Sequence, residues 1–296
     1  MKVLLVYNSH AGSGFAGKML RQVEAEFNEN SIEFDIQITN YPGHAIEIVK
    51  NADLSKYDGL VAAGGDGTLF EVINGYFQNA SGVKIPIGVL PVGTGNAFAR
   101  DLELESTMWK EAVKIIASQN TRKVDVGKFH THGQDYYYLN ILGIGFVADV
   151  AIIAHKLKVF GNIAYTLGVL YRTLFLSADR MTFEIDGQKF EYDCTFVEIS
   201  NTRYTANFLM APNAIIDDGL LDVTIAKKLT RIKLLKSFPK IFTGEHVNLP
   251  EVETFQAKSI KINSVSQKIL SPDGELIGIT PVEIECLPQA IEVFWK

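Results

Sequence analysis

The chain has few cysteines, no excess of basic charge and no long hydrophobic run. Only Cys194 and Cys286 occur in 296 residues, too few and too far apart for a disulfide scaffold or a four-ligand zinc site. A reducing compartment is therefore expected. The 28 Lys and Arg residues against 34 Asp and Glu residues give a net charge of −6. That balance argues against a general nucleic-acid binder, which needs basic residues to neutralise phosphates.

Apolar runs are too short for a signal peptide or a membrane span. The start, Met1–Asn8, carries one lysine and a five-residue apolar run, short for the core of a signal peptide. The longest uncharged stretch is Val159–Tyr171, thirteen residues interrupted by glycine, whereas a bilayer needs about 20 apolar residues. We therefore expect a cytoplasmic protein that does not cross a membrane.

The composition is that of a globular protein, with 47% hydrophobic and 21% charged residues. At roughly 100–200 residues per domain, the length suggests two domains. We place the first at residues 1–124 and the second at residues 125–296. The final strand, Ala290–Trp295, could return to pack on the first domain.

The first 120 residues alternate short apolar runs with segments of helical period, the pattern of a parallel sheet wrapped by helices. This predicts an α/β N-terminal domain. The predicted strands are Lys2–Tyr7, Glu33–Thr39, Gly59–Ala63 and Ile85–Val92. The predicted helices are Gly17–Glu29, His44–Asn51, Thr68–Phe77 and Thr107–Ser118.

After about Thr121 the pattern changes to strands rich in β-branched and aromatic residues, which predicts an antiparallel β-rich domain, a β-sandwich. Asp186-Gly187 between two such strands is a strong hairpin signal. The predicted strands are Lys123–Phe129, Tyr136–Gly145, Met181–Ile185, Lys189–Ser200, Leu220–Ala226, Ser259–Asn263 and Pro281–Cys286. Two inserted helices are expected, Ala148–Ala178 with a break near Gly161, and Thr230–Thr243.

Two glycine-rich corners follow strands of the first domain, at Gly64-Gly65-Asp66-Gly67-Thr68 and at Gly93-Thr94-Gly95-Asn96. In open α/β sheets ligands bind outside the carboxyl ends of the strands. Glycines allow the backbone to approach a ligand, and a helix N-terminus attracts anions. Together the corners predict a polyphosphate cradle; the alternative for the first is a tight turn capped by Asp66.

An earlier segment, Gly12–Met19, partly matches two phosphate-binding motifs. It fails the first, G-x-x-x-x-G-K-[ST], because Met19 replaces the hydroxyl residue that would hold Mg²⁺. It fits the glycines of G-x-G-x-x-G, but Asn8 to Ala11 separate them from the strand. A phosphate site is favoured here, because free N–H groups precede a helix; a structural turn remains the alternative.

The motifs together resemble the diacylglycerol kinase family, in its bacterial soluble lipid kinase branch. The resemblance rests on the two glycine corners, on Ala211-Pro212-Asn213-Ala214, on Asp217-Asp218-Gly219-Leu220-Leu221-Asp222 and on Asp273-Gly274-Glu275. They stand in family order across nearly the whole chain. The resemblance implies an NAD kinase/diacylglycerol kinase-like N-terminal domain, a β-rich C-terminal domain and an active site in the cleft between them. It also makes a homodimer reasonable.

The resemblance also implies roles for individual residues, with ATP and Mg²⁺ as the cofactors. ATP binding falls to Asn8, Ser9, His10, Ala11, Gly12, Thr39, Gly65, Asp66, Gly67, Thr68, Leu69, Phe70, Glu71 and Thr94. The cradle adds Gly64, Gly93, Gly95 and Asn96. Glu275 or Asp273 would take the proton of a lipid hydroxyl, while Asp66 could hold catalytic Mg²⁺ or act as the base. A structural Mg²⁺ would bind the Asp218 carboxylate and the backbone oxygens of Ile215 and Leu220, hard ligands that suit the ion.

The sequence departs from the family pattern at two positions. Ser9 stands where the first loop usually has Pro, and Ala97 stands where acylglycerol kinases commonly have Asp. The form Gly-Asn-Ala is more like sphingosine and ceramide kinases, as is Asn201–Thr205. Diacylglycerol, giving phosphatidic acid, is the expected substrate. The alternatives are a sphingoid base or other lipid, an NAD kinase-like enzyme, and a nucleotide-sensing module without catalysis.

A basic segment suggests how such an enzyme reaches its lipid. Lys227–Lys240 carries six Lys and Arg residues and no acid, a local charge of +6 interleaved with Leu and Phe. We expect peripheral association with an anionic membrane surface; the alternative is a helix docked on its own domain. The uncharged Val159–Tyr171 could line an acyl-chain pocket, although core packing is the simpler interpretation.

Overall fold

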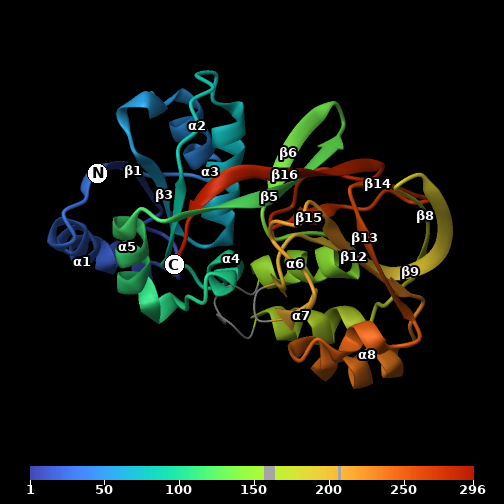
Figure 1. Ribbon diagram of the computed structural model, residues 1–296. Coiled ribbons are helices and arrows are strands. Elements are labelled where there is room, and N and C mark those ends of the chain that lie inside the picture. Colours follow the sequence, from blue (N-terminus) through green and yellow to red (C-terminus); the bar gives the residue numbers. More distant parts are fainter. Residues whose placement is uncertain (157–163, 206–207) are drawn as a thin grey trace. The chain divides into compact units, whose positions relative to one another are not determined.

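The computed structural model describes residues 1–156, 164–205 and 208–296 of the chain (Figure 1). Two compact units are present. Unit 1 comprises Met1–Val124 together with Gln289–Lys296, and unit 2 comprises Asp125–Pro288. The α/β and β-rich folds that were predicted for the two parts of the chain are both found.

Unit 1 contains a parallel sheet in the order β2-β1-β3-β4. Its strands are β1 (Lys2–Tyr7), β2 (Glu33–Ile38), β3 (Gly59–Gly64) and β4 (Ile87–Pro91). The end of β16 (Val282–Phe294) adds beside β4, where Val293 pairs with Ile87 in parallel. All six residues of β3 are buried, as expected for a parallel strand covered on both faces.

Helices connect these strands. They are α1 (Phe15–Glu29), α2 (His44–Asn51), α3 (Asp66–Gln78), α4 (Ala97–Asp101) and α5 (Trp109–Ser118), with short 3₁₀ turns at Leu54–Lys56 and Ser106–Met108. In α5 the residues Trp109, Ala112, Val113 and Ile116 are buried, because three- and four-residue spacing places them on one face. The five-residue α4 was not predicted, since one turn is too short to show a period.

Unit 2 is built on antiparallel strands in the order β13-β12-β9-β8-β14-β16. Strand β7 pairs with both β9 and β15, and β5 pairs with β6. The remaining bounds are β5 (Thr121–Thr131), β6 (Gln134–Tyr138), β7 (Ile141–Gly145), β8 (Asp179–Ile185), β9 (Gln188–Ser200), β10 (Tyr204–Thr205), β11 (Phe208–Leu209), β12 (Leu221–Lys227), β13 (Val252–Ala257), β14 (Ser259–Ser264) and β15 (Leu270–Pro272). Asp186 and Gly187 both have positive φ, 46° and 81°, in the predicted hairpin between β8 and β9.

The prediction of one strand over Tyr136–Gly145 was wrong, because β6 and β7 are separate. The backbone N–H groups of Leu139 and Asn140, at the junction, donate to the side chain of Asp273. Their hydrogen bonds therefore go to a distant residue rather than to a neighbouring strand. Nothing in the local pattern signals such a partner.

The helices of unit 2 are α6 (Phe146–Lys156), α7 (Ala164–Thr173) and α8 (Arg231–Ser237), which lie on one side of this unit (Figure 1). The predicted break near Gly161 lies outside the described residues. The predicted helix Thr230–Thr243 was too long: α8 ends at Ser237, and 3₁₀ turns follow at Phe238–Phe242 and Glu245–Asn248. Pro239 has no N–H for an α-helical bond. None of the helices described is long and apolar enough to span a bilayer.

Candidate functional site

The loops predicted to bind phosphate all follow strands of the parallel sheet in unit 1. The segment Asn8–Gly14 follows β1, Thr39–Gly43 follows β2, Gly65 follows β3, and Val92–Asn96 follows β4. Parallel strands present their carboxyl ends at one edge, and ligands of open α/β sheets bind there. The fold therefore brings these four loops to the same edge of the sheet.

The two glycine corners are in direct contact. The backbone N–H groups of Val92 and Gly93 donate to the Gly64 carbonyl at 3.2 and 3.0 Å. A Cβ atom on Gly93 would lie 2.3 Å from the Gly65 Cα, closer than any side chain permits. Asn96, at φ +50°, donates its side-chain N–H to the Gly93 carbonyl at 2.8 Å. The corners thus form one continuous backbone surface.

Asp66 links the two corners through its carboxylate. Its Oδ1 accepts hydrogen bonds from the N–H groups of Ala97 at 2.7 Å and Phe98 at 3.4 Å, at the start of α4. Desolvation raises the pKa of Asp66 to about 6, although these N–H groups oppose the shift. A Cβ atom on Gly95 would come within 2.7 Å of the other oxygen, Oδ2. In this structure Asp66 therefore caps the N-terminus of α4. The roles expected for it from the sequence, holding catalytic Mg²⁺ or acting as the base, stay predictions.

The loop after β1 is tied to the first glycine corner. The Asn8 side chain donates from Nδ2 to the Thr68 hydroxyl at 3.0 Å, and its Oδ1 accepts from the His10 N–H at 3.0 Å. Space for a Cβ atom on Gly12 is closed by the Val92 carbonyl, at 2.9 Å. The Ser9 carbonyl accepts the Gly17 N–H at 2.9 Å, a backbone bond that ties this loop to α1.

Several residues assigned to ATP have structural side chains. Leu69 and Phe70 point into the core of unit 1, with 3% and 2% exposure, and Thr39 is also buried. The Glu71 carboxylate accepts from the N–H groups of Gly43 at 2.7 Å and Ala45 at 3.0 Å, at the start of α2. Because the side chains of Leu69 and Phe70 are buried, only the backbone of these two residues remains available to a nucleotide.

The Asp273-Gly274-Glu275 motif forms a tight turn after β15 in unit 2. The Asp273 carboxylate accepts three backbone hydrogen bonds, from Leu139 at 3.0 Å, Asn140 at 2.9 Å and Ile141 at 3.0 Å. Asp273 is 8% exposed and has φ +46°. Glu275 is half-buried, and its carboxylate has no hydrogen-bond or ion-pair partner among the residues that the structure describes. The two acids of the motif therefore have different environments.

A buried polar network surrounds this turn. The Asn201 side chain donates to the carbonyls of Asp125 at 2.9 Å and Leu139 at 3.0 Å, and the Thr202 hydroxyl donates to the Asn140 side chain at 3.3 Å. These contacts connect β5, β7 and the segment after β9. Sequence reasoning noted Asn201 and Thr202 only as a family resemblance, because partners this distant carry no local signal.

The predicted metal turn, Ile215–Leu220, lies at the surface of unit 2. Asp218 is exposed and its Oδ1 accepts the Leu220 N–H at 3.0 Å. Asp125, which sequence reasoning missed, is fully buried and accepts the Gly219 N–H at 2.6 Å. Burial, and then the charge of Asp218, raise the pKa of Asp222 to about 6. In the described ranges no three His, Cys, Asp or Glu side chains are placed to hold a metal, so any cation here would depend on backbone oxygens.

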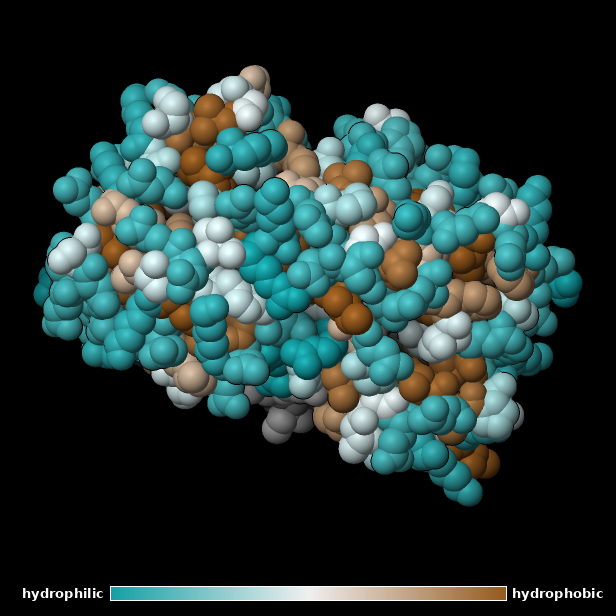
Figure 2. Space-filling model, viewed as in Figure 1, coloured by the Kyte–Doolittle hydropathy of each residue, from teal (hydrophilic) through white to brown (hydrophobic). Residues whose placement is uncertain are grey.

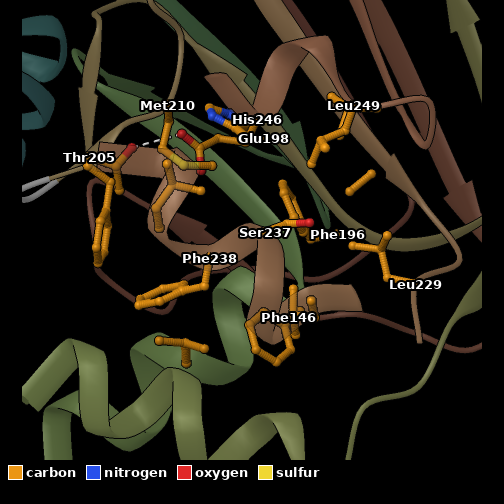
Figure 3. Close-up of a pocket in the computed structure, with 16 residues that line it drawn as sticks. Phe146, Phe196, Glu198, Thr205, Met210, Leu229, Ser237, Phe238, His246 and Leu249 are labelled. Carbon is orange, nitrogen blue, oxygen red and sulfur yellow. Dashed lines mark hydrogen bonds between the residues drawn. The ribbon is translucent and has the colours of Figure 1, made fainter. Parts of the chain in front are cut away.

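Unit 2 also contains an apolar cavity that is open to solvent (Figure 3). Its volume is about 670 Å³, which includes the open space at its mouth. Its wall draws on α6, β9, β11, β12, β13, α8 and the segments beside them, and it includes Phe146, Val150, Phe196, Phe208, Met210, Ala226, Leu229, Leu234, Phe238, Ile241, Leu249 and Val252. At one side Glu198 accepts the Thr205 hydroxyl at 2.7 Å near His246. Burial raises the pKa of Glu198 to about 7. Residues 159–163 of the uncharged stretch Val159–Tyr171 lie outside the described residues, so the role suggested for that stretch in an acyl-chain pocket stays a prediction.

The basic segment Lys227–Lys240 covers this cavity. Leu234, Phe238 and Ile241 pack inward, whereas Ile232, Leu235 and Phe242 are 69%, 43% and 47% exposed. Figure 2 shows hydrophobic residues mixed with hydrophilic ones on the surface in the region of α8. Lys227 pairs with Glu253, and Lys233 with Glu251, which lowers the local charge from +6 to +4. The segment is thus docked on its own unit while keeping an exposed basic and apolar face.

Comparison with known families assigns both parts of the chain. Residues 2–129 match the model described as "Diacylglycerol kinase catalytic domain". Residues 140–295 match the model described as "YegS C-terminal NAD kinase beta sandwich-like domain". The two matches together cover nearly the whole chain.

Curated relatives and solved structures agree with these matches. The chain is 32% identical to a diacylglycerol kinase of Staphylococcus carnosus, covering 98% of this chain and 94% of that protein. It is 30% identical to a diacylglycerol kinase of Bacillus subtilis, with the same coverage, and 27% identical to sphingosine kinase 1 of Arabidopsis thaliana, covering 100% and 72%. A solved structure from Bacillus anthracis strain Sterne, provisionally named a diacylglycerol kinase, superposes with a TM-score of 0.81 at 28% identity, covering 100% and 97%.

Proposed function

Because this chain belongs to the diacylglycerol kinase family and is a lipid kinase, we propose that it transfers the γ-phosphoryl group of ATP, with Mg²⁺, to the hydroxyl of diacylglycerol. The observation that supports the nucleotide part is the close contact between Gly65 and Gly93, which joins the two glycine corners at the strand ends of unit 1. Phosphoryl transfer requires mainly positioning and charge neutralisation. A rigid backbone surface beside the N-terminus of α3 meets both needs.

Glu275 is the base in this proposal. Asp273 already accepts three backbone N–H groups, so that taking a proton would cost it those bonds. Glu275 is half-buried, and no described residue occupies its carboxylate, which can therefore meet a hydroxyl. We assign Asp273 to holding the turn that presents Glu275, and Asp66 to holding the two nucleotide corners in register.

Mg²⁺ enters the proposal at two places, on the nucleotide and on the turn of unit 2. Asp218, with the backbone oxygens of Ile215 and Leu220, would hold the structural ion. One exposed carboxylate with carbonyl oxygens is a donor set that Mg²⁺ accepts. The Asp218 charge also acts on Asp222, whose pKa is raised first by burial and then by that charge. Such an ion would neutralise that charge and fix the turn. The protein groups around it, Asp125 and Asn201, hold the same region from the buried side.

The apolar cavity of unit 2 is the proposed site for an acyl chain. Its wall consists mainly of apolar side chains, as in most ligand pockets, and such a wall suits a hydrocarbon chain. The exposed residues Ile232 and Leu235 lie on the basic segment that covers it, and the exposed Phe242 follows two residues after that segment. The segment also carries four lysine and arginine residues that are not paired with Glu251 or Glu253. We propose that this face rests on an anionic membrane surface, where each basic residue contributes about 1 kcal/mol.

A single experiment tests the reaction and the acceptor. The protein is incubated with γ-labelled ATP, Mg²⁺ and separate acceptors: diacylglycerol, sphingosine, phosphatidylglycerol and NAD. Labelled phosphatidic acid is the expected product. Label on sphingosine instead would favour the second candidate, a sphingoid-base kinase, which the Gly-Asn-Ala97 corner supports. If neither diacylglycerol nor sphingosine became labelled, the proposal would be contradicted.

A further inference from the structure

An aromatic pair lies between the end of β2 and the start of α2, formed by the exposed Tyr41 and the half-buried His44. Tyr41 and His44 stack with ring centroids 4.5 Å apart and an angle of 18° between their planes. Tyr41 is 49% exposed, so that one ring face is covered by His44 while much of the side chain is open. An open aromatic face is costly to expose and is well suited to stacking on a flat ligand.

Hydrogen bonds hold the pair in place. The Tyr41 hydroxyl donates to Glu47 Oε2 at 2.8 Å, the Asn40 N–H donates to His44 Nδ1 at 3.1 Å, and the His44 N–H donates to the Tyr41 carbonyl at 3.1 Å. Exposed side chains normally lose rotamer freedom when they bind a ligand. These bonds fix the rings beforehand and reduce that cost.

The pair is anchored to the proposed phosphate loops within unit 1. Glu71 binds the N–H groups of Gly43 and Ala45, on either side of His44, at 2.7 and 3.0 Å. One helical turn before Glu71, about 5.4 Å along the axis, Thr68 accepts the Asn8 side chain at the glycine corner. The aromatic pair therefore lies at the same edge of the sheet as the glycine corners, separated from them by about a turn of α3 and a short loop.

We propose that Tyr41, backed by His44, is the platform on which the adenine ring of ATP stacks; the inference rests on the function proposed above. In a nucleoside triphosphate the ribose separates the base from the phosphates. With the phosphates at the glycine corners, the base would reach the loop after β2, where Tyr41 lies. Every base has a flat face, and stacking on an aromatic side chain contributes about 1–3 kcal/mol. Tyr41 would then raise affinity for the base and leave affinity for the phosphates unchanged.

The test measures binding of ATP and of inorganic tripolyphosphate to the full chain by titration calorimetry. Tyr41→Ala should weaken ATP binding about tenfold and leave tripolyphosphate binding unchanged. Tyr41→Phe keeps the ring but loses the bond to Glu47, and should bind ATP within about twofold of the unaltered protein. Tyr57→Ala is the matched control, because Tyr57 also donates to a carboxylate, Asp35, at 2.9 Å. Tyr57 precedes β3, at the end of the strands opposite the glycine corners, so this variant should bind ATP like the unaltered protein.

The outcomes separate this inference from the proposed function. If the unaltered protein binds neither ligand, both fail. If it binds ATP but Tyr41→Ala binds ATP equally well, the platform alone is refuted. Equal weakening of ATP and tripolyphosphate would also refute it, because Tyr41 would then only shape the loop. Since Tyr41 is exposed, its variants should fold, which unchanged tryptophan fluorescence would verify.

Discussion

Replacing Glu198 with glutamine should stabilise unit 2 at alkaline pH and leave it nearly unchanged at acid pH. Glu198 is fully buried on β9, where its Oε1 accepts hydroxyl groups from Thr205 at 2.7 Å and Ser200 at 3.3 Å. Burial raises its pKa from 4.5 to about 7. The folded protein therefore holds a proton that the unfolded chain has already released between these two values.

The sign and size follow from proton linkage. Stability is highest below pH 4.5, where both states are protonated, and falls as the pH rises through the folded pKa near 7. Each unit of pKa shift corresponds to about 1.36 kcal/mol, so the full penalty is about 3 kcal/mol. The amide introduced by Glu198→Gln cannot ionise and still accepts the Thr205 hydroxyl. The variant should therefore exceed the original by about 3 kcal/mol at pH 8.5 and by less than about 1 kcal/mol at pH 5.

The placement of thiols permits an assay specific to unit 2. Both cysteines, Cys194 and Cys286, are buried and lie in unit 2, whereas both tryptophans, Trp109 and Trp295, lie in unit 1. Thiol labelling in a urea series, normalised at each pH to the unfolded protein, reports the unfolding of unit 2. Tryptophan fluorescence follows unit 1 in the same samples and should be unaffected.

Glu191→Gln on the same strand is the control for this experiment. Glu191 is exposed and paired with Arg180 at 2.6 Å, so the loss of its charge should change stability little, with no gain at high pH. Because Asp222 also titrates near pH 6 in unit 2, only the difference between variant and original is interpreted. A difference that stays flat from pH 5 to 8.5 would refute the reasoning.

Three further predictions address catalysis, the nucleotide corners and the membrane face. Glu275→Gln should lower kcat by a factor of about 10² or more with ATP affinity intact in calorimetry; an unchanged kcat would exclude it as the base. Gly93→Ala should force the corners apart, costing about 1–3 kcal/mol of stability and weakening ATP binding, which thermal unfolding and calorimetry measure. Reversing Lys236 and Lys240 to Glu should reduce sedimentation with anionic vesicles more than tenfold, whereas Lys233→Glu, which only breaks the pair with Glu251, should matter less. Equal effects of all three reversals would contradict that interpretation.

The strands of the parallel sheet were predicted closely, because each is a buried apolar run bounded by polar turn residues. Strand β1 begins and ends at the predicted residues, as does helix α2. The hairpin at Asp186-Gly187 was predicted from two residues alone, since positive φ is a local property of the turn. The motifs likewise sufficed to recognise the family, because their order along the chain is itself sequence information.

The environment of each acid was decided only by the tertiary structure. From the sequence, Glu275 is the usual nominee for the base and Asp273 a close rival, yet residues more than 130 positions away supply the three N–H groups that occupy Asp273. Asp66 meets Ala97 and Phe98 only because β3 and β4 are neighbours. Long-range partners leave no trace in local period or composition.

The sequence by itself determined the strands of the parallel sheet, the Asp186-Gly187 hairpin and the membership of the chain in this lipid kinase family, since these depend on local pattern and motif order. It did not determine the break between β6 and β7 or the end of α8. The tertiary structure alone decided that two lysines of the basic segment are paired with Glu251 and Glu253, that Glu198 is buried beside an apolar cavity, and that Tyr41 stands open on His44. Burial and pairing depend on which distant segments pack together, and these set the charge and hydrogen-bonding state of every candidate group.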